Sequence, residues 1–234
     1  MHSFFVSGID TGIGKTYVTG ILLRYLRAIG RSAISLKFVQ TGNETFSEDI
    51  DLHRKIAGTG LLPEDLDHTT APQIFRFPSS PKLAAEREHR TIDLSAILSS
   101  VEKLSDSGRI VLVEGAGGLM VPLDEGHYII DVVRQAGWKL LLVTSGRLGS
   151  LNHTLLSLEA AFSRKIPVAA ILYVKDPSAD PLIDRDSPCE IRRFCAARGH
   201  ADIPVLPVPW VSLDALPPLS EMPDFSPAFR LLAD

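Results

Sequence analysis

Cysteine is scarce in this sequence, and its scarcity excludes a fold that depends on several disulfide bonds for its stability. Only Cys189 and Cys195 occur among the 234 residues. They lie six positions apart in a segment with a helical pattern, and six residues of helix rise about 9 Å, beyond the usual Cα separation of a disulfide. We therefore expect two free thiols, as is typical of a protein in a reducing compartment.

Long apolar runs and an excess of basic residues are also missing. No run approaches the roughly 18 apolar residues of a membrane-spanning helix, and the first residues lack the basic and apolar regions of a secretory signal. Lys and Arg number 24 against 28 Asp and Glu, a formal net charge of −4. The basic field of a general nucleic-acid binder is therefore absent. We expect a cytoplasmic protein that binds neither membranes nor nucleic acid.

The sequence also lacks the motifs that are typical of two kinds of catalytic site. The seven histidines show no pair at the spacing of zinc ligands, which disfavours a zinc site. No Gly-x-Ser-x-Gly sequence occurs, which disfavours an α/β-hydrolase. What is present is an ordinary globular composition, with 45% apolar and 22% charged residues. A chain of this length and composition buries a core without a disulfide or metal.

Short apolar runs alternate with helical patterns along the chain. The expected strands are 3–7, 32–38, 109–113, 139–144 and 168–173, nearly continuous apolar runs typical of strands covered on both faces. Helical stripes lie between them, one of them after an N-cap at Asp93. The alternation predicts one α/β domain over residues 1–234, with a mainly parallel sheet and helices on both faces. The proline-rich tail from Ile203 is expected to be an irregular surface segment.

The most informative motif is Gly8-Ile-Asp-Thr-Gly-Ile-Gly-Lys15-Thr16, which follows the first expected strand and opens a helix. Glycines there let backbone N–H groups turn around phosphates, and the helix N-terminus adds partial positive charge. In such a phosphate loop, Lys15 reaches the β- and γ-phosphates and the Thr16 hydroxyl binds Mg²⁺. Five residues separate Gly8 from Gly14, one more than the usual pattern. The motif predicts binding of a nucleoside triphosphate with Mg²⁺.

Two other expected strands end in charged residues. Glu114 follows the run 109–113 and precedes a glycine-rich turn, a position that suits a carboxylate linked to a metal. Its alternative is a common acidic strand end without that role. Lys37 ends the run 32–38, and ligands of open α/β sheets lie at the carboxyl ends of strands. Lys37 would then stabilise charge during phosphoryl transfer, and its alternative is a solvated lysine.

Two further segments have equally open interpretations. Asp49 and Asp51 stand in Ser-Glu-Asp-Ile-Asp, which is either part of the site or the polar start of a helix. The run 148–153, Leu-Gly-Ser-Leu-Asn-His, follows another strand and precedes a helix. It is either a plain helix start or a cradle for an anion.

Four motifs in order are similar to those of the dethiobiotin synthetases. They are Gly-x-Asp-Thr-x-x-Gly-Lys-Thr, Lys-x-Val-Gln-Thr-Gly, Val-Glu-Gly-Ala-Gly-Gly and Leu-Gly-x-Leu-Asn-His. The resemblance covers residues 3 to about 175 and, more loosely, 208–210. It implies a three-layer fold of the P-loop NTPase type and a homodimer. It also implies that ATP, with Mg²⁺, drives the joining of CO2 to 7,8-diaminononanoate in biotin synthesis, closing a cyclic urea.

The resemblance assigns a role to each matching position. Lys37 would be the catalytic cation with Lys15 beside it, and Thr16, Asp49 and Glu114 would surround Mg²⁺. Thr41, Ser80 and Pro81 would bind the diamine substrate or its carbamate. The substrate carboxylate would be bound by Gly149, Ser150, Leu151 and Asn152 of the partner subunit. ATP would be bound by Gly12, Ile13, Gly14, Lys15, Thr16, Tyr17, Asp49, Glu114, Gly115, Ala116, Gly117, Lys175, Pro207, Val208 and Pro209.

Three positions depart from the family pattern. Gly12 stands where some members carry an acidic residue, and Phe38 replaces the usual proline after the catalytic lysine. Lys175 stands where several members have an asparagine that reads adenine. A lysine side chain can only donate hydrogen bonds, whereas an amide both donates and accepts. We therefore expect weaker selectivity for the base of ATP.

Two other functions use related loops. An amide-forming synthase of the cobyrinic-acid type generally needs a glutamine-hydrolysing domain with a catalytic cysteine, and little chain follows Cys195. A partitioning or positioning ATPase, which acts as a switch, carries an additional lysine early in the phosphate loop. Residues 9–13 contain no lysine, and no basic membrane-targeting helix closes the chain. Both alternatives are disfavoured by these residues.

Overall fold

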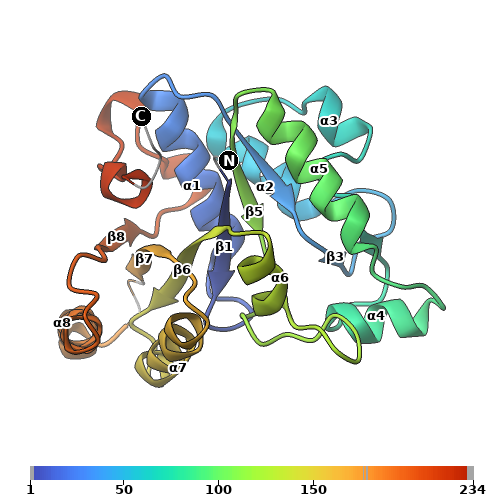
Figure 1. The fold of residues 1–234 in the computed structure, drawn as a ribbon. Coiled ribbons are helices and arrows are strands. Elements are labelled where there is room, and N and C mark those ends of the chain that lie inside the picture. The colour runs from blue at the N-terminus through green and yellow to red at the C-terminus, as the bar shows by residue number, and fades with distance from the viewer. Residues whose placement is uncertain (1–2, 176, 178, 231–234) are drawn as a thin grey trace.

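A parallel six-stranded sheet forms the centre of the computed structural model, which describes residues 3–230 except 176 and 178. Its strands are β1 (Ser3–Gly8), β2 (Ala33–Lys37), β5 (Ile110–Glu114), β6 (Lys139–Ser145), β7 (Val168–Lys175) and β8 (Val205–Pro209). They lie in the order β2-β5-β1-β6-β7-β8 (Figure 1). The chain leaves β1 toward β2 and later returns past β1 toward β8. Ligands of open α/β sheets bind at the carboxyl ends of strands at such a switch point.

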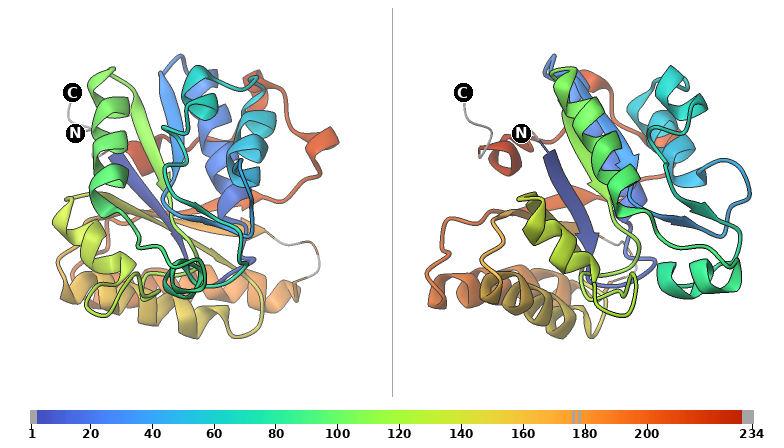
Figure 2. Two further views of the ribbon diagram at one scale, coloured as in Figure 1. Left: turned by 90° about the vertical axis from the view of Figure 1, so that its right-hand side faces the viewer. Right: turned by 45° about the vertical axis from the view of Figure 1, so that its right-hand side comes forward.

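Helices cover both faces of the sheet (Figure 2). One face carries α1 (Lys15–Ala28) and α2 (Glu48–Ala57), with α3 (Pro63–Leu66) near α2. The other face carries α5 (Leu94–Asp106), α6 (Ile129–Gln135), α7 (Ser150–Ser163) and α8 (Pro181–Ala197). A parallel pair, β3 (Gln40–Thr41) and β4 (Ile74–Phe75), extends the structure beyond β2 together with α4 (Pro81–Arg87). The three-layer α/β fold predicted from the sequence is confirmed.

The C-terminal segment of the described chain returns to the face that carries α1. It contains three short 3-10 turns, η1 (Leu213–Ala215), η2 (Leu219–Glu221) and η3 (Ser226–Phe229). Phe229 packs edge-on against Phe4 of β1, with ring centroids 5.2 Å apart. Tyr25 of α1 lies against the rings of both Phe225 and Phe229. This segment therefore covers apolar surface that β1 and α1 would otherwise expose.

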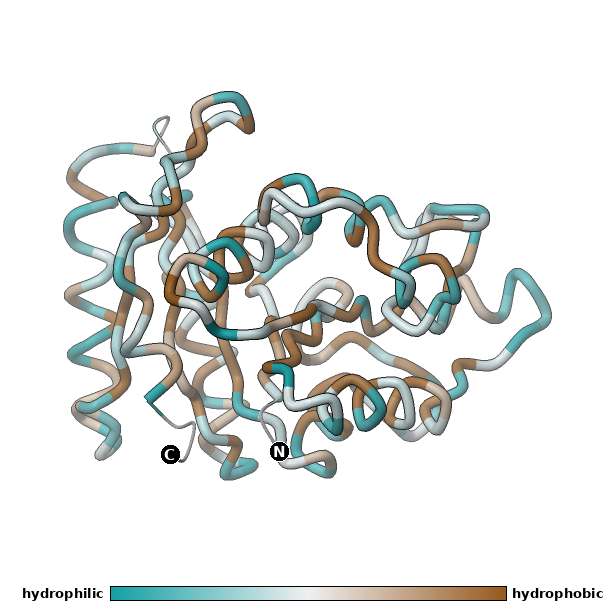
Figure 3. The backbone as a smooth tube through the Cα atoms, turned by 90° about the horizontal axis from the view of Figure 1, so that it is seen from above, coloured by the Kyte–Doolittle hydropathy of each residue, from teal (hydrophilic) through white to brown (hydrophobic). Residues whose placement is uncertain are grey.

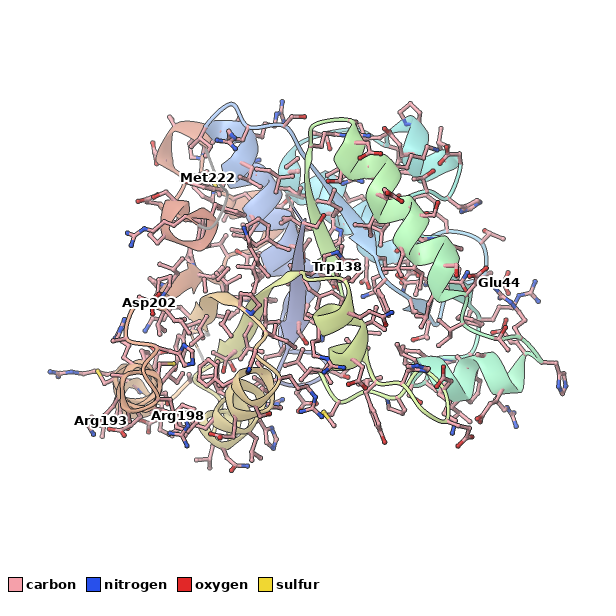
Figure 4. The ribbon with its side chains drawn as sticks, viewed as in Figure 1. Glu44, Trp138, Arg193, Arg198, Asp202 and Met222 are labelled. Atoms are coloured by element: carbon pink, nitrogen blue, oxygen red, sulfur yellow. The ribbon has the colours of Figure 1, made fainter. Side chains whose placement is uncertain are left out.

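The apolar core lies between the sheet and its helices, where Figure 3 shows hydrophobic positions along the central strands. Phe5 of β1 stacks on Trp138, which lies near the middle of the molecule in Figure 4, with centroids 5.7 Å apart. Phe38 meets both rings edge-on and is fully buried. The phenylalanine that departs from the family's usual proline is thus a core residue that braces the strand end beside Lys37.

Close packing of α1 on α2 brings the start of α2 to the phosphate loop. A Cβ at Gly20 would lie 2.7 Å from Cβ of Ile56, so only glycine permits this approach. The Ser47 hydroxyl caps α2 by accepting a hydrogen bond from the Ile50 N–H at 3.2 Å. The first turn of α2, which contains Asp49, therefore lies beside the N-terminal end of α1.

The five strands expected from apolar runs are present, and their ends differ from the prediction by at most two residues. The expectation of an irregular tail from Ile203 is wrong, because 205–209 form β8. This strand pairs only with β7, so Pro207 and Pro209 stand on an edge strand, where a missing N–H costs no ladder hydrogen bond. Cys189 and Cys195 are free thiols, as expected. No helix of the described ranges is long and apolar enough to cross a membrane.

Candidate active site

A cleft of about 780 Å³ opens at the carboxyl ends of β1, β2 and β5. The phosphate loop after β1 forms one wall, and the β3 and α4 region forms the opposite wall. Many of the predicted site residues line it, although they come from segments far apart in the sequence. These are Gly12, Gly14, Lys15, Thr16, Tyr17, Lys37, Thr41, Asp49, Ser80, Pro81, Glu114, Ala116 and Gly117.

The phosphate loop has the backbone conformation that its glycines permit. Gly12 and Gly14 have φ angles of 70° and 94°, in the left-handed region. Gly14 is the N-cap of α1, and no side chain accepts a hydrogen bond there. The first N–H groups of α1 therefore remain available to an anion. The Ile13 side chain is buried, so this residue can offer the cleft only its backbone.

Lys15 is the first residue of α1, and its side chain folds back over the loop. Its Nζ donates a hydrogen bond to the Asp10 carbonyl at 2.9 Å, and the residue is only 8% exposed. Burial, and after it the neighbouring Lys37 ammonium, lower the pKa of Lys15 to about 8. A phosphate group bound in the loop would place a negative charge beside this ammonium and would favour its charged form.

Three oxygen-bearing side chains meet next to Lys15. The Thr16 hydroxyl lies 3.1 Å from Asp49 Oδ1 and 3.0 Å from Glu114 Oε1. Lys37 Nζ lies 2.8 Å from the same Glu114 oxygen and also forms an ion pair with Asp49. These four side chains come from α1, α2, β5 and β2, so the tertiary structure assembles a charged cluster from four elements.

The charges in this cluster compensate one another. Burial alone would raise the pKa of Glu114, but the Lys37 ammonium and the contact with His53 together outweigh burial and hold the pKa far below its usual range. Burial would likewise lower the pKa of Lys37, but Glu114 and Asp49 raise it above the ordinary value. Lys37 is 5% exposed, which rules out the alternative of a solvated lysine at a strand end.

The donor set fits Mg²⁺. Mg²⁺ prefers oxygen ligands, and proteins usually hold it through one or two carboxylates together with phosphate oxygens and water. The Thr16 hydroxyl has one proton for two carboxylate oxygens, so the cluster is rich in acceptors that a cation would satisfy. Within the ranges that the structure describes, no group of three or more His, Cys, Asp or Glu side chains gathers at metal-binding distances. The arrangement favours a cation shared with a phosphate over one held by the protein alone.

A buried histidine completes the cluster, and sequence reasoning did not single it out. His53 Nε2 lies 2.6 Å from Glu114 Oε2, and both side chains are fully buried. His53 Nδ1 lies 2.9 Å from the Ser35 hydroxyl, which also accepts a hydrogen bond from Arg54 at 3.0 Å. Asp49 and His53 stand one helical turn apart on α2, a spacing that places them on one face. That spacing was the only local signal, because Glu114 approaches His53 through the fold.

The Glu114 turn serves packing as well as ligand access. A Cβ at Gly115 would lie 2.7 Å from the Phe5 ring, so this glycine accommodates the core. Gly115 does not line the cleft, unlike Ala116 and Gly117. The assignment of Gly115 to nucleotide binding therefore has no support from its position.

Two of the residues assigned to the adenine base line a second cleft and not the main one. Lys175 and Pro207 line a second cleft of about 320 Å³, where Lys175 Nζ pairs with Asp184 at 2.6 Å. The side chain of Val208 is fully buried and cannot contact a base. The Pro209 carbonyl accepts a hydrogen bond from the Tyr17 hydroxyl at 2.7 Å. This bond ties the end of β8 to α1.

The side chain of Trp210, which directly follows β8, lies near the phosphate loop. Trp210 lines the main cleft and is 47% exposed. Its ring lies against Tyr17 with centroids 4.6 Å apart, and it stands 3.5 Å from the position of a Cβ at Gly14. An exposed indole in this place can pack against a planar base.

The segment Gly149–Asn152 does not join the main cleft of its own chain. Gly149 and Leu151 line a separate cleft of about 700 Å³ together with Leu148 and Leu182. The side chain of Ser150 is buried, and Asn152 is exposed. One chain alone therefore brings the phosphate half of the predicted site together, but not the half assigned to the substrate carboxylate.

Comparisons with solved structures support the fold. The MinC:MinD cell division protein complex of Aquifex aeolicus has a TM-score of 0.55 at 14% identity, over 89% of this chain and 81% of that chain. A pNOB8 ParA bound to nonspecific DNA has a TM-score of 0.52 at 14% identity, over 87% and 78%. At such low identity these likenesses concern architecture alone.

Comparisons with protein families and curated sequences go further. A family model described as an AAA domain matches residues 2–212. The ATP-dependent dethiobiotin synthetase BioD of Chlorobaculum tepidum is 48% identical over 212 residues, 91% of this chain and 89% of that protein. The ATP-dependent dethiobiotin synthetase BioD 2 of Haemophilus influenzae is 47% identical over 179 residues, 76% and 94%. With this identity over most of both chains, the chain belongs to the ATP-dependent dethiobiotin synthetases, ligases of biotin biosynthesis.

Proposed function

We propose that this dethiobiotin synthetase joins CO2 to 7,8-diaminononanoate in the 780 Å³ cleft and closes a cyclic urea, converting ATP to ADP and phosphate. The observation that carries the proposal is the cluster of Thr16, Lys37, Asp49 and Glu114, linked by contacts of 3.1 Å or less beside the phosphate loop. The cleft volume lies within the range of small-molecule sites, roughly 300–1,000 Å³. It accommodates a triphosphate tail and a short diamine side by side.

The reaction proceeds in three steps. One amine of the substrate adds to CO2 and loses a proton, which gives a carbamate. A carbamate oxygen attacks the γ-phosphorus, the bond to the β-phosphate oxygen breaks, and ADP leaves. The second amine attacks the carbonyl carbon of the mixed anhydride and expels phosphate, and loss of a proton completes the ring. Such chemistry asks the protein for positioning and charge neutralisation more than for covalent participation.

The buried ammonium groups perform the neutralisation. Lys15 follows the phosphate loop and binds the β- and γ-phosphates, and Lys37 stabilises the transferring phosphoryl group. Thr16, Asp49 and Glu114 would hold Mg²⁺, which supplies additional positive charge at the phosphates when bound. The ion pairs of Lys37 with Asp49 and Glu114 hold its ammonium in the lining of the cleft, beside the phosphate loop.

The opposite wall of the cleft receives the diamine. Thr41 is the last residue of β3, and Ser80 and Pro81 form the start of α4. All three line the cleft across from the phosphate loop. The Thr41 hydroxyl would hydrogen-bond an amine of the substrate or the carbamate formed from it.

A homodimer completes the site in this proposal. Gly149–Asn152 lie at the start of α7, outside the main cleft of their own chain, and would receive the substrate carboxylate in the partner's site. Leu148 and Leu182, beside this segment, are 84% and 77% exposed. Large exposed apolar side chains of this kind are typical of interfaces.

The proposed enzyme is cytoplasmic, and residues 1–234 form one domain.

The test is direct product analysis. The protein is incubated with 7,8-diaminononanoate, ¹³C-bicarbonate and Mg-ATP, and the products are examined by mass spectrometry. The cyclic urea should carry the label, and ADP should appear in equal amount. Lys37→Ala serves as the matched control and should form neither product at a comparable rate. Consumption of ATP without a labelled cyclic urea would overturn the proposed reaction.

A further inference from the structure

The two carboxylate oxygens of Glu114 have different surroundings. Oε1 faces the cleft, where Lys37 Nζ lies at 2.8 Å and the Thr16 hydroxyl at 3.0 Å. Oε2 points the other way and meets His53 Nε2 at 2.6 Å. Glu114 and His53 are both fully buried. The carboxylate is therefore oriented by partners on both sides, and one of its oxygens is turned away from the cleft.

A chain of hydrogen bonds sets the direction of the His53 contact. The Arg54 guanidinium can only donate, so its bond of 3.0 Å to the Ser35 hydroxyl uses that oxygen as an acceptor. The Ser35 proton is then available to His53 Nδ1 at 2.9 Å. With Nδ1 accepting, the ring carries its proton on Nε2 and donates it to Glu114 Oε2. The order of donors thus runs from Arg54 through Ser35 and His53 to Glu114.

The far end of this chain is anchored in the fold. Arg54 donates two hydrogen bonds to the Asp65 carboxylate, at 2.9 and 2.7 Å. Asp65 also accepts from the Leu62 N–H at 2.7 Å and from the Thr70 hydroxyl at 2.8 Å. The side chains of Arg54 and Asp65 are buried. A network of buried hydrogen bonds therefore stands behind Glu114, and His53 links it to the carboxylate.

We propose that His53 is a positioning residue that holds Oε2 of Glu114 away from the cleft, so that the carboxylate offers a cation one oxygen and the enzyme prefers Mg²⁺ to Ca²⁺. This inference rests on the proposed metal-binding role of Glu114. Mg²⁺ requires compact, nearly octahedral ligation, whereas Ca²⁺ accepts more ligands and readily takes both oxygens of one carboxylate. A carboxylate pinned through one oxygen suits Mg²⁺. A carboxylate free to rotate would offer both oxygens and accommodate Ca²⁺ better.

The test measures binding and does not depend on turnover. The dissociation constant of a non-hydrolysable ATP analogue is determined by calorimetry in saturating Mg²⁺ and, separately, in saturating Ca²⁺. The Ca²⁺ value divided by the Mg²⁺ value is the cation preference. Loss of a partner behind a metal ligand typically costs 10–100-fold in metal affinity. We therefore expect His53→Ala to lower the cation preference by about tenfold or more.

Matched variants separate positioning from general destabilisation. His53→Gln keeps a donor for Oε2 and should restore most of the preference, whereas Ser35→Ala removes the donor to Nδ1 and should lower the preference by a smaller factor. Ile56→Val removes a methyl group from the core side of the same helix and should leave the preference at the wild-type value. Circular dichroism and the Tm of each variant show whether it is folded.

Each outcome bears on a distinct claim. An unchanged cation preference in folded His53→Ala overturns the positioning role, provided that Glu114→Gln weakens binding in Mg²⁺. Should His53→Ala fail to fold, an unchanged preference in Ser35→Ala overturns the role equally. If Glu114→Gln has wild-type affinity with both cations, Glu114 is not a metal ligand, and the proposed metal site fails together with this inference.

Discussion

At the scale of single residues, buried charge decides what each side chain does. Glu114 is fully buried and keeps its negative charge because Lys37 lies 2.8 Å away. Lys37 is itself only 5% exposed and depends on Glu114 and Asp49. Removal of one partner from a buried ion pair leaves the other uncompensated, at a typical cost of about 3–5 kcal/mol. These residues therefore contribute to the stability of the free enzyme as well as to the proposed reaction.

Lys37→Ala tests the proposed cation of phosphoryl transfer. We expect kcat to fall by on the order of 10²-fold or more, as for loss of one preorganised electrostatic group. The Tm of the free enzyme should also fall, because Glu114 loses its partner. Steady-state kinetics at saturating substrates and thermal unfolding measure the two effects. A variant with near-normal kcat would exclude Lys37 from the mechanism.

Lys175→Asn tests the reading of the nucleotide base. In the wild type Lys175 is paired with Asp184 and its ammonium can only donate, whereas an asparagine amide at that position both donates and accepts and can read the edge of adenine. Loss of a paired base contact should forfeit roughly 1–3 kcal/mol of discrimination. We therefore expect CTP and GTP to support turnover with kcat/KM within about tenfold to a hundredfold of ATP, since each 1.4 kcal/mol is about a factor of ten. The substitution should widen the gap in favour of ATP. A wild-type preference for ATP above about a thousandfold would show that adenine is read elsewhere.

At the scale of elements, ion pairs join segments that are far apart in the sequence. The pair of Arg54 and Asp65 connects α2 to the short helix α3. Arg147, which follows β6, forms an ion pair of 2.9 Å with Asp10 in the phosphate loop. The first pair is buried and the second is exposed, so the first contributes more to holding its elements together. The site is thus positioned by contacts between elements as well as by the strands that carry its residues.

Asp65→Asn tests the contact between α2 and α3 and its pH dependence. Burial alone would raise the pKa of Asp65, but the Arg54 guanidinium and the hydrogen bonds from the Leu62 N–H and the Thr70 hydroxyl together outweigh burial and lower the pKa. A carboxyl with a lowered folded-state pKa adds stability above its unfolded pKa of about 3.9, and that stability is lost as the pH falls through the folded value. We expect the substitution to cost about 3 kcal/mol at pH 7. The difference from wild type should shrink below pH of about 4.

Denaturant unfolding at several pH values measures this difference. Asp106→Asn at the exposed end of α5 is a suitable control and should change the free energy of unfolding by less than about 0.5 kcal/mol. A penalty for Asp65→Asn that stays constant down to pH of about 3 would show that ionisation of Asp65 does not contribute.

At the scale of the whole molecule, the described chain brings the residues of the proposed phosphate site into one cleft and leaves the residues proposed for the substrate carboxylate outside it. The family relationship favours a dethiobiotin synthetase over the amide-forming synthase and over the partitioning ATPase. The likeness of fold to MinD and ParA does not separate these functions, because unrelated activities share this architecture. What distinguishes the chain is the set of side chains at the strand ends and the exposed start of α7.

A mixed dimer tests whether two chains share each site. Lys37→Ala removes the proposed catalytic cation from the phosphate half of the site. Asn152→Asp places a negative charge where the substrate carboxylate is proposed to bind. Each homodimer should be inactive, because every site contains one lesion. In the mixed dimer both lesions fall in one composite site, so the other site should remain competent. Activity recovered on mixing the two purified variants, after exchange of subunits, is the expected result. Mixed dimers as inactive as their parents would exclude a shared site.

The sequence by itself determined the features that depend on local patterns. Buried parallel strands appear as continuous apolar runs because both faces are covered, and this predicted β1, β2, β5, β6 and β7. The phosphate loop was predicted because its glycines are needed wherever such a backbone turns around an anion. Order along the chain was sufficient to place Lys37 and Glu114 at strand ends on one edge of the sheet.

Only the tertiary structure decided features that depend on which segments become neighbours. The prolines of β8 are compatible with a strand because β8 is an edge strand, which no local pattern reveals. Packing of α1 on α2 at Gly20 brings the first turns of α2 close to β5. His53 of α2 thereby contacts Glu114 of β5, although Glu114 lies 61 positions further along the chain. Gly115 leaves room for the Phe5 ring in the core, although the sequence motif suggested that this glycine lets a ligand approach the backbone. Local conformation is governed by neighbours in sequence, whereas burial, charge compensation and hydrogen-bond partners are governed by neighbours in space.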